Sequence, residues 1–266
     1  MSAPAPETFL SGQVGHVGRR APALRAVDAA LDAWLRLRGV PRRLDELAAQ
    51  PPRRRVLAVS ADRPDSERID AIARELRAGR HDVRLELGSA AELRGGKFQN
   101  LNALLETRGD EDWILVVDDD VLLPERFVDR MLGVCEHFEL DLAQPALTRA
   151  SHGAWQVTRR RAGPLARKTR FVEIGPVTLI GRGPAAELIP FPDLSMGWGL
   201  DLHWAALAER RGWRLGVVDA LPVRHDLAGV ASSYSHEEAV AEAQRFLADH
   251  DFLPASEANE TVRELD

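Results

Sequence analysis

The chain has 266 residues, 45% of them hydrophobic and 29% charged, with a formal net charge of −6 at pH 7. A chain of this length forms one large domain or two small ones, and its charge balance gives no support to nucleic-acid binding as the main function. A single cysteine, Cys135, excludes an internal disulfide. No signal peptide is visible, and no apolar run reaches the roughly 18 residues that span a bilayer. We therefore expect a cytoplasmic protein, with peripheral attachment to a membrane left open.

Residues 1–54 are predicted to form a helical extension that is rich in arginine. Residues 19–55 hold ten arginines against four acids. Within them, residues 23–38 place several large apolar side chains near one face of a helix, namely Leu24, Val27, Leu31, Trp34 and Leu35. Two interpretations stay open. The helix packs on its own domain, or it rests as an interfacial helix on anionic lipid or on a partner.

Residues 55–147 alternate between strand and helix patterns. Strands are predicted at residues 56–60, 83–87, 113–117 and 140–147, and helices at about 66–78, 97–106 and 124–138. Gly79 is expected to end the first of these helices, and Pro124 to begin the third. This alternation predicts an α/β fold with a mainly parallel sheet flanked by helices.

The second half of the chain is less regular. Residues 148–170 hold seven basic side chains with little periodicity, which predicts a solvated loop or a loop that closes over a phosphorylated ligand. A strand is expected at 170–180, a helix from 200 to 211 that ends at Gly212, and a strand at 213–218. An irregular stretch containing His225, a helix at 234–249 and a frayed acidic tail follow. The main domain is therefore expected to cover residues 55–250, and residues 251–266 the tail.

The strand at residues 113–117 runs directly into three acids, in the stretch WILVVDDD. Two carboxylates about 4 Å apart repel each other by about 4 kcal/mol at an effective dielectric constant of about 20. The acids must therefore be solvated, protonated or neutralised by a cation. Side chains alternate along extended backbone, so Asp118 and Asp120 can face the same way while Asp119 points elsewhere. A solvated turn is one interpretation, and an oxygen-rich site for Mg²⁺ or Mn²⁺ is the other.

The position of these acids at a strand end indicates a type of ligand. In open α/β sheets, ligands bind beyond the carboxyl ends of the strands. A divalent ion with few protein ligands completes its shell with water and substrate phosphates. The metal interpretation thus predicts a nucleotide diphosphate, whose departure the ion would assist by absorbing charge.

The stretch of strand, three acids, proline and helix, preceded by GGKFQNLNALLE at 95–106, resembles the donor half of GT-A-fold glycosyltransferases, including family 2-like enzymes. The later half resembles the glycosyltransferase-like family called domain of unknown function 707. The matching segments are QPAL at 144–147, FVE at 171–173, PV at 176–177, GWGLD at 197–201 and GVVDALPVRH at 216–225. The resemblance implies a GT-A, Rossmann-like sheet with a smaller mixed region. Residues 55–147 would bind the nucleotide sugar, and residues 148–230 the acceptor and the metal.

The resemblance also implies roles on the donor side. Asp118 would face the ribose or the metal, Asp120 would be the direct metal ligand, and His225 would complete the coordination. Asp119 belongs to the same donor motif, and Lys97 and Asn102 would lie near the nucleotide. Each position has a simpler interpretation. His225 could be an ordinary surface or core histidine, and Lys97 and Asn102 could form the polar face of a helix start.

On the acceptor side, the resemblance assigns Asp201 as the general base that takes the proton of the acceptor hydroxyl. Trp198 would lie against a sugar ring, and Glu173 is a second candidate for the base or for acceptor binding. A helix N-terminus favours the charged form of Asp201. The simpler interpretations are that Asp201 caps the helix and that Trp198 packs in the core.

The leading hypothesis is a metal-dependent glycosyltransferase with Mn²⁺ or Mg²⁺ as its cofactor. A UDP-sugar is the first candidate donor. The acceptor would be a hydroxyl group of a glycan, a lipid-linked molecule or a small molecule, and Asp201 as base favours inversion. Leu87-Gly88-Ser89-Ala90 departs from the Asp-Gly-Ser-type turn of many family 2 enzymes, so the nucleobase stays open. Two alternatives remain: a nucleotidyltransferase of similar fold, and a catalytically silent subunit that binds nucleotide sugars.

Overall fold

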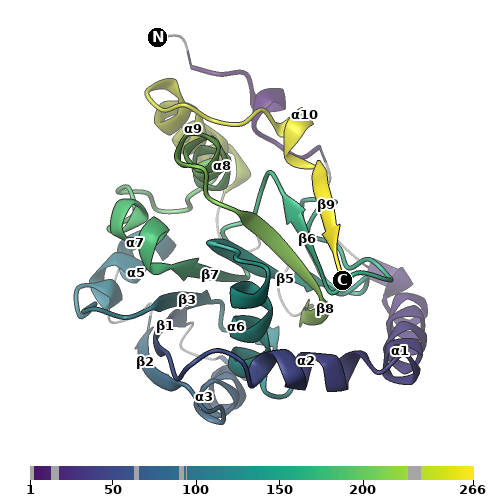
Figure 1. Cartoon of the computed structure of the whole chain (residues 1–266). Coiled ribbons are helices and arrows are strands. Elements are labelled where there is room, and N and C mark those ends of the chain that lie inside the picture. Colours follow the sequence, from purple (N-terminus) through teal and green to yellow (C-terminus); the bar gives the residue numbers. More distant parts are fainter. Residues whose placement is uncertain (1–2, 13–17, 63–65, 90–92, 94, 227–234) are drawn as a thin grey trace.

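The computed structural model describes residues 3–12, 18–62, 66–89, 93, 95–226 and 235–266. Within these residues a nine-stranded sheet has the order β2-β1-β3-β7-β5-β8-β6-β9, and β4 pairs with β8 beside this path (Figure 1). The strands are β1 (Arg55–Asp62), β2 (Asp82–Ser89), β3 (Trp113–Val117), β4 (Val121–Leu122), β5 (Leu142–Leu147), β6 (Ala166–Thr169), β7 (Val177–Gly181), β8 (Leu215–His225) and β9 (Thr261–Leu265).

The helices precede the sheet, connect its strands and follow it. They are the short 3₁₀ helices η1 (Pro6–Thr8) and η2 (Gly18–Arg20), and the α-helices α1 (Ala21–Leu37), α2 (Val40–Ala48), α3 (Ile69–Arg77), α5 (Lys97–Leu105), α6 (Phe127–His137), α7 (Arg182–Leu188), α8 (Leu200–Arg211), α9 (His236–Ala248) and α10 (Ala255–Ala258). None of the helices in the described part of the chain is both long and apolar enough to cross a membrane.

Most strands of the sheet run in one direction. Strand β1 pairs in parallel with β2 and β3, and β5 pairs in parallel with β8. Strand β7 lies antiparallel between β3 and β5, and β6 lies antiparallel between β8 and β9. The expected α/β class, a mainly parallel sheet flanked by helices, is therefore confirmed.

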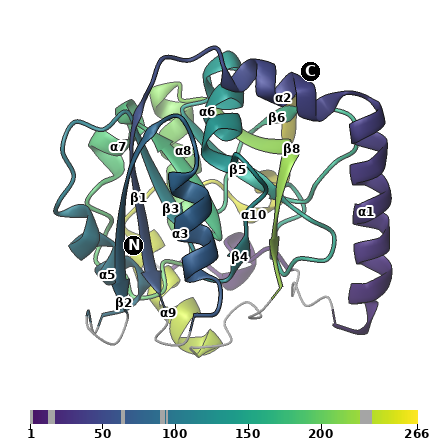
Figure 2. The same cartoon turned by 90° about the horizontal axis from the view of Figure 1, so that it is seen from below.

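Helices cover both faces of the sheet (Figure 2). Along β1, Leu57 and Val59 enter one core together with residues of α5, α7, α8 and α9. Val56 and Ala58, on the opposite face, enter a second core with residues of α2, α3 and α6. Because side chains alternate between the faces of a strand, a strand covered on both sides must be apolar throughout. This explains the continuous apolar run of β3.

The arginine-rich N-terminal helix α1 packs on its own domain, which is the first of the two interpretations given for it. The carboxylate of Asp28 in α1 accepts hydrogen bonds from the backbone N–H groups of Arg149 and Ala150, both at 3.1 Å. Asp32 forms an ion pair with the buried Arg160 at 2.6 Å. The predicted apolar face is only partly used, because Leu35 is buried while Val27 and Trp34 remain exposed.

The basic segment predicted as a loop at 148–170 is irregular up to residue 165, but much of it is packed into the fold and not solvated. The side chain of Arg167 is fully buried and makes a bidentate contact with Asp219, at 2.7 and 3.0 Å. Arg159 donates to three backbone carbonyl groups nearby, and Arg170 pairs with acids of α8 and of the C-terminal segment. These arginines stabilise the fold and are not available to a phosphorylated ligand. Their acidic partners lie too far away in the sequence for local patterns to indicate them.

Several element boundaries differ from the predictions. Helix α6 begins at Phe127 and not at Pro124, because Arg126 adopts a left-handed conformation with φ of 58°. The residues before it form β4, which pairs with the end of β8. Strand β8 itself continues to His225, where an irregular stretch was expected. The strand predicted at 170–180 is limited to β7, which starts at Val177.

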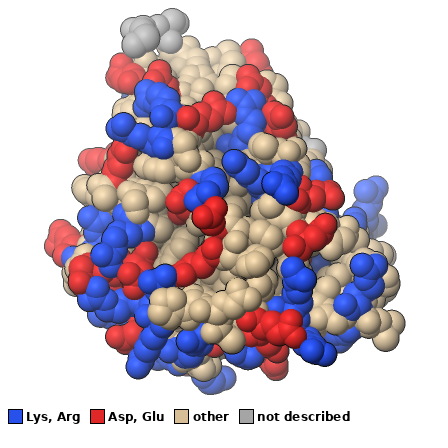
Figure 3. Space-filling model, viewed as in Figure 1, with Lys and Arg blue, Asp and Glu red and all other residues tan. Residues whose placement is uncertain are grey.

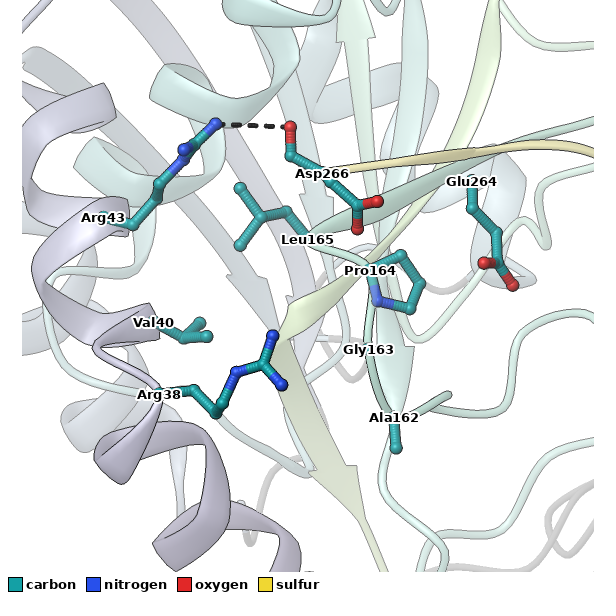
Figure 4. A pocket seen from close by; sticks show the side chains of 9 residues that line it. All are labelled: Arg38, Val40, Arg43, Ala162, Gly163, Pro164, Leu165, Glu264 and Asp266. Carbon is teal, nitrogen blue, oxygen red and sulfur yellow. Dashed lines mark hydrogen bonds between the residues drawn. The ribbon is translucent and has the colours of Figure 1, made fainter.

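The frayed tail predicted for the C-terminal residues is also wrong. Residues 255–258 form α10, and β9 completes one edge of the sheet beside β6. Figure 4 shows how this strand meets the N-terminal helices across a pocket of about 510 Å³, where Arg43 donates a hydrogen bond to the backbone oxygen of Asp266 at 3.2 Å. The acidic, sparsely apolar sequence suits an edge strand, which has only one neighbour and little need for apolar side chains.

Candidate active site

Three predicted metal ligands meet at the carboxyl end of β3. One ligand atom each from Asp118, Asp120 and His225 lie within 4.8 Å of one another. The Nε2 atom of His225 lies 3.1 Å from Oδ1 of Asp120. The cause is the pairing of β4 with β8, which aligns Val121 with His225 and so places the end of β8 beside the acidic turn. Asp119 is not part of this group, as the alternation of side chains predicted.

Lys97 brings a positive charge to the same place. It is the first residue of α5, and its Nζ atom lies 2.7 Å from Oδ1 of Asp118. The loop before β7 passes close to this pair. A Cβ atom at Gly175 would lie 3.0 Å from Nζ of Lys97 and 3.2 Å from Oδ2 of Asp118. Lys97 therefore offsets part of the carboxylate repulsion in the acidic turn.

Two further carboxyl groups, those of Glu173 and Asp201, are buried and interact with each other. Burial raises the pKa of Glu173 to about 7, although the positive charges of His225, Arg159 and Lys97 oppose this increase. Burial, and then the charge of Glu173, raise the pKa of Asp201 to about 8. The helix N-terminus is expected to favour the charged form of Asp201, and the backbone N–H groups of Leu202 and Asp201 do lower this pKa. Burial and the neighbouring carboxylate outweigh them.

The Asp201 side chain does not cap α8. The N-cap residue of α8 is Gly199, and Oδ1 of Asp201 accepts a hydrogen bond from the N–H of Leu202, the next residue. Capping, the simpler interpretation of this acid, is thus not supported. The Trp198 ring is half-buried and meets the ring of His236 edge to face, with centroids 5.0 Å apart.

The turn that carries Trp198 and leads into α8, where Asp201 lies, is held by Glu242 of α9. Its carboxylate accepts hydrogen bonds from the backbone N–H groups of Ser195, Met196 and Gly197, at 2.7 to 2.9 Å. Gly197 has φ of 79°, and a Cβ atom there would lie 2.1 Å from the ring of Phe98. The close approach of the turn to α5 therefore requires glycine at this position.

Sequence reasoning missed several residues that position the site. Glu242 follows the turn by about 45 residues, and no local signal connects the two. Arg68 donates to the backbone oxygen of Asp120 at 2.7 Å and pairs with Asp226 at 2.8 Å. Ser66 donates to the backbone oxygen of Asp119 at 2.9 Å, and the Gln144 side chain accepts a hydrogen bond from the N–H of Glu173. Only Gln144 carried a sequence signal, as the first residue of the QPAL segment.

The Asn102 side chain contacts the loop that follows α7. Its side-chain amide donates to the backbone oxygen of Phe191 and accepts from the N–H of the same residue, both at 2.8 Å. This two-fold contact holds the loop after α7 against α5. The polar atoms of Asn102 therefore have partners in the protein, and its place near a nucleotide stays a prediction.

The three convergent side chains fit a hard divalent cation. Two carboxylate oxygens and one imidazole nitrogen form a donor set that suits Mn²⁺ or Mg²⁺. Burial alone would lower the pKa of His225, but the hydrogen bond and the charge of Asp120 outweigh burial and raise it. The charge of Asp120 therefore favours positive charge at this position.

The similarity to known proteins is distant. No family model matches the sequence, and no curated protein matches it. Among solved structures, the chain is similar to S. aureus TarS in complex with UDP-GlcNAc, with 11% identity and a TM-score of 0.48 over 75% of this chain and 68% of that chain. A second TarS structure has 11% identity and a TM-score of 0.44, over 75% and 66% of the two chains.

A third similar structure is GalNAc-T7 with UDP, GalNAc and Mn²⁺. It has 10% identity and a TM-score of 0.45, over 66% of this chain and 44% of that chain. At these identities and TM-scores, no residue role is transferred to this chain. The resemblance to the domain of unknown function 707 therefore stays a prediction that rests on the sequence segments alone.

Proposed function

We propose that the chain is a metal-dependent glycosyltransferase that moves a sugar from a nucleotide-diphosphate donor to a hydroxyl acceptor. The observation that carries the proposal is the convergence of Asp118, Asp120 and His225 at the carboxyl end of β3. This is the edge at which open α/β sheets bind nucleotides. The same site holds Lys97, and it adjoins two carboxyl groups with raised pKa values, which are common at catalytic sites.

Asp118, Asp120 and His225 would hold Mn²⁺ or Mg²⁺. A bound ion of this kind offsets the negative charge of a diphosphate, both in the donor and in the leaving group. Lys97, next to Asp118, is placed to add a second positive charge toward the phosphates. The backbone contacts of Arg68 and Ser66 keep the acidic turn in position for this task.

Asp201 is proposed as the general base. It would accept the proton of the acceptor hydroxyl while that oxygen forms a bond to the anomeric carbon and the bond from this carbon to the diphosphate breaks. Attack on the face opposite the leaving group inverts the anomeric configuration. Glu173 raises the pKa of Asp201, which makes the carboxylate of Asp201 a stronger base once it has lost its proton. Trp198, in the same turn, would contact the acceptor.

The test is a thermal-shift screen of UDP, GDP, CDP and dTDP, each with and without Mn²⁺. A ligand at 100 times its dissociation constant adds about 2.7 kcal/mol to the free energy of unfolding, which raises the Tm by roughly 5–10 °C. We expect one nucleoside diphosphate to stabilise the protein only when Mn²⁺ is present. No stabilisation by any of the four would contradict the proposal.

Two variants make the screen specific to the site. Asp120→Ala is expected to remove the metal-dependent shift, whereas Asp249→Asn, an exposed acid at the end of α9, should retain it. Release of nucleoside diphosphate from the donor sugar in the presence of Mn²⁺ then separates an enzyme from a silent binding subunit. Binding without any release of nucleoside diphosphate would favour the silent subunit.

A further inference from the structure

The outward face of α1 carries large apolar side chains that nothing in the described structure covers. Val27, Trp34 and Leu37 are 48%, 39% and 89% exposed. They are seven and three residues apart, so they lie on one face of the helix, and the exposed Ala30 lies between them. The helix stands at one edge of the molecule in both views (Figures 1 and 2). The result is an exposed apolar stripe on a projecting helix.

The charges around this stripe are all of one sign. Asp28 and Asp32 are the acids of α1, and both turn toward the domain, where they bind the 149–150 backbone and Arg160. Exposed arginines lie at both ends of the stripe, with Arg19 and Arg20 before the helix and Arg36 and Arg38 at its last turn. In the space-filling view, basic and uncharged side chains occupy the lower right, where α1 lies (Figure 3).

Arg38 also contacts the stripe directly. Its guanidinium lies 5.1 Å from the centroid of the Trp34 ring. In the part of the chain that the structure describes, no carboxylate lies within ion-pair distance of Arg19, Arg20 or Arg36. Long basic side chains beside an apolar stripe extend their charged ends toward an anionic surface while their apolar stems stay near it.

The positive charge around the stripe favours an anionic surface over a second copy of the chain as the partner of this face. A second copy of the chain would bring arginines against arginines, which disfavours a dimer through α1. The molecule as a whole carries a net charge of −6, so its remaining surface would turn away from an anionic surface while α1 turns toward it. A straight, projecting helix with an apolar stripe and basic ends matches the known form of interfacial helices.

We propose that α1 docks on a lipid bilayer that contains anionic headgroups. Val27, Trp34 and Leu37 insert at the boundary between headgroups and acyl chains, and Arg19, Arg20, Arg36 and Arg38 bind the lipid phosphates. The helix stays attached to the domain through Asp28 and Asp32 on its other face. The proposal is independent of the proposed catalytic function, because it involves none of the residues at the end of β3.

Vesicle flotation of the full-length chain tests the proposal. We expect the protein to float with vesicles of phosphatidylcholine and phosphatidylglycerol and not with phosphatidylcholine alone, and the binding to weaken at high salt. Arg36→Gln/Arg38→Gln should lower the partition coefficient about fivefold for each arginine removed. Trp34→Ser/Leu37→Ser should lower it by roughly tenfold or more.

Matched controls carry the same changes elsewhere on the surface. Arg74→Gln/Arg77→Gln alters two exposed arginines of α3, and Val262→Ser alters an apolar side chain of β9 that is 52% exposed. Both should bind vesicles as the unchanged protein does. All of the substituted side chains are exposed, so each variant should retain the Tm of the unchanged protein.

Trp34 also reports its own position. A blue shift of the fluorescence on addition of anionic vesicles, absent in Trp34→Phe, would place this ring in the bilayer. Absence of flotation with anionic vesicles would overturn the proposal, and so would equal binding by the α1 variants and the controls. Formation of a dimer that Trp34→Ser/Leu37→Ser abolishes, without vesicle binding, would assign the stripe to a second copy instead.

Discussion

Asp201 combines a position in the first turn of α8 with a carboxyl group that is only 6% exposed. Burial and Glu173 together raise its pKa to about 8. As a general base it must be ionised, so kcat/KM is expected to rise about tenfold per pH unit below pH 8 and to level off above it. Glu173→Gln removes a negative charge next to Asp201 and should therefore move this inflection to lower pH. A pH–rate profile of both proteins checks the expectation, and an unchanged inflection in the variant would contradict it.

Replacing Asp201 itself should separate binding from turnover. Asp201→Asn is expected to bind Mn²⁺ and nucleotide as before while kcat falls by roughly 10²–10⁴-fold, the usual contribution of a general base. The same variant also tests the burial of the carboxyl group through stability. The unfolded chain loses this proton near pH 4 and the folded protein only near pH 8, so the ionised carboxylate destabilises the fold as the pH rises between these values.

The Asn variant cannot ionise, and its stability relative to the unchanged protein should therefore increase from pH 5 to pH 8. We expect a gain of roughly 2 kcal/mol or more at pH 8, equivalent to about 4–8 °C in Tm. Thermal melts across this pH range measure it. A difference in Tm that does not depend on pH would mean that Asp201 titrates normally, and wild-type turnover in the variant would remove it as the base.

At the scale of elements, the turn between α7 and α8 depends on α9. Three backbone N–H groups of the turn donate to one carboxylate, that of Glu242, which is itself 9% exposed. Hydrogen bonds to a charged group contribute more than neutral ones, and a buried donor left without a partner costs about 1–3 kcal/mol. The orientation of Trp198 and Asp201 therefore rests on an element that follows them in the chain.

Glu242→Gln should loosen this turn, because the amide accepts fewer hydrogen bonds and carries no charge. We expect the Tm to fall by a few degrees, the KM for the acceptor to rise and kcat to fall, while metal-dependent binding of nucleotide is retained. Glu237→Gln changes an exposed glutamate in the first turn of the same helix and serves as the control. If both variants show the same acceptor kinetics as the unchanged protein, Glu242 has no role in positioning the turn.

For the whole molecule, the sheet joins parts of the chain that are far apart in sequence. Strand β9 completes the edge beside β6, and the Asn259 side chain before it accepts a hydrogen bond from the N–H of Val157 at 3.1 Å. Deletion of residues 260–266 would leave the edge of β6 unpaired, and an unpaired edge strand favours association with other chains. The C-terminal segment is thus expected to contribute to folding and to keeping the chain monodisperse.

We expect this deletion to lower the Tm by roughly 5 °C or more and to increase aggregation on heating. Val262→Ser, which keeps the strand and alters one exposed side chain, should change the Tm by less than about 2 °C. Thermal melts followed by light scattering compare the three proteins. A truncated protein that melts and scatters like the full-length chain would show that β9 adds nothing to stability.

Local sequence patterns predict the features that depend on neighbouring residues. The alternation of strand and helix at 55–147, the end of α8 at Gly212 and the common side of Asp118 and Asp120 all follow from backbone geometry within a few residues. The sequence segments also singled out His225, Asp201 and Glu173, although they did not bring them together.

Tertiary contacts determine which of these residues meet, and how deeply each of them is buried. His225 reaches the acidic turn because β4 pairs with β8, across about 100 residues of chain. Burial, which raises the pKa values of Glu173 and Asp201, depends on packing from all sides. Arg167 pairs with Asp219, and Glu242 binds the turn before α8. In both cases the partner lies far away in the sequence. Local periodicity reports backbone conformation and the face that is buried, whereas such contacts form only once the sheet and its helices have packed.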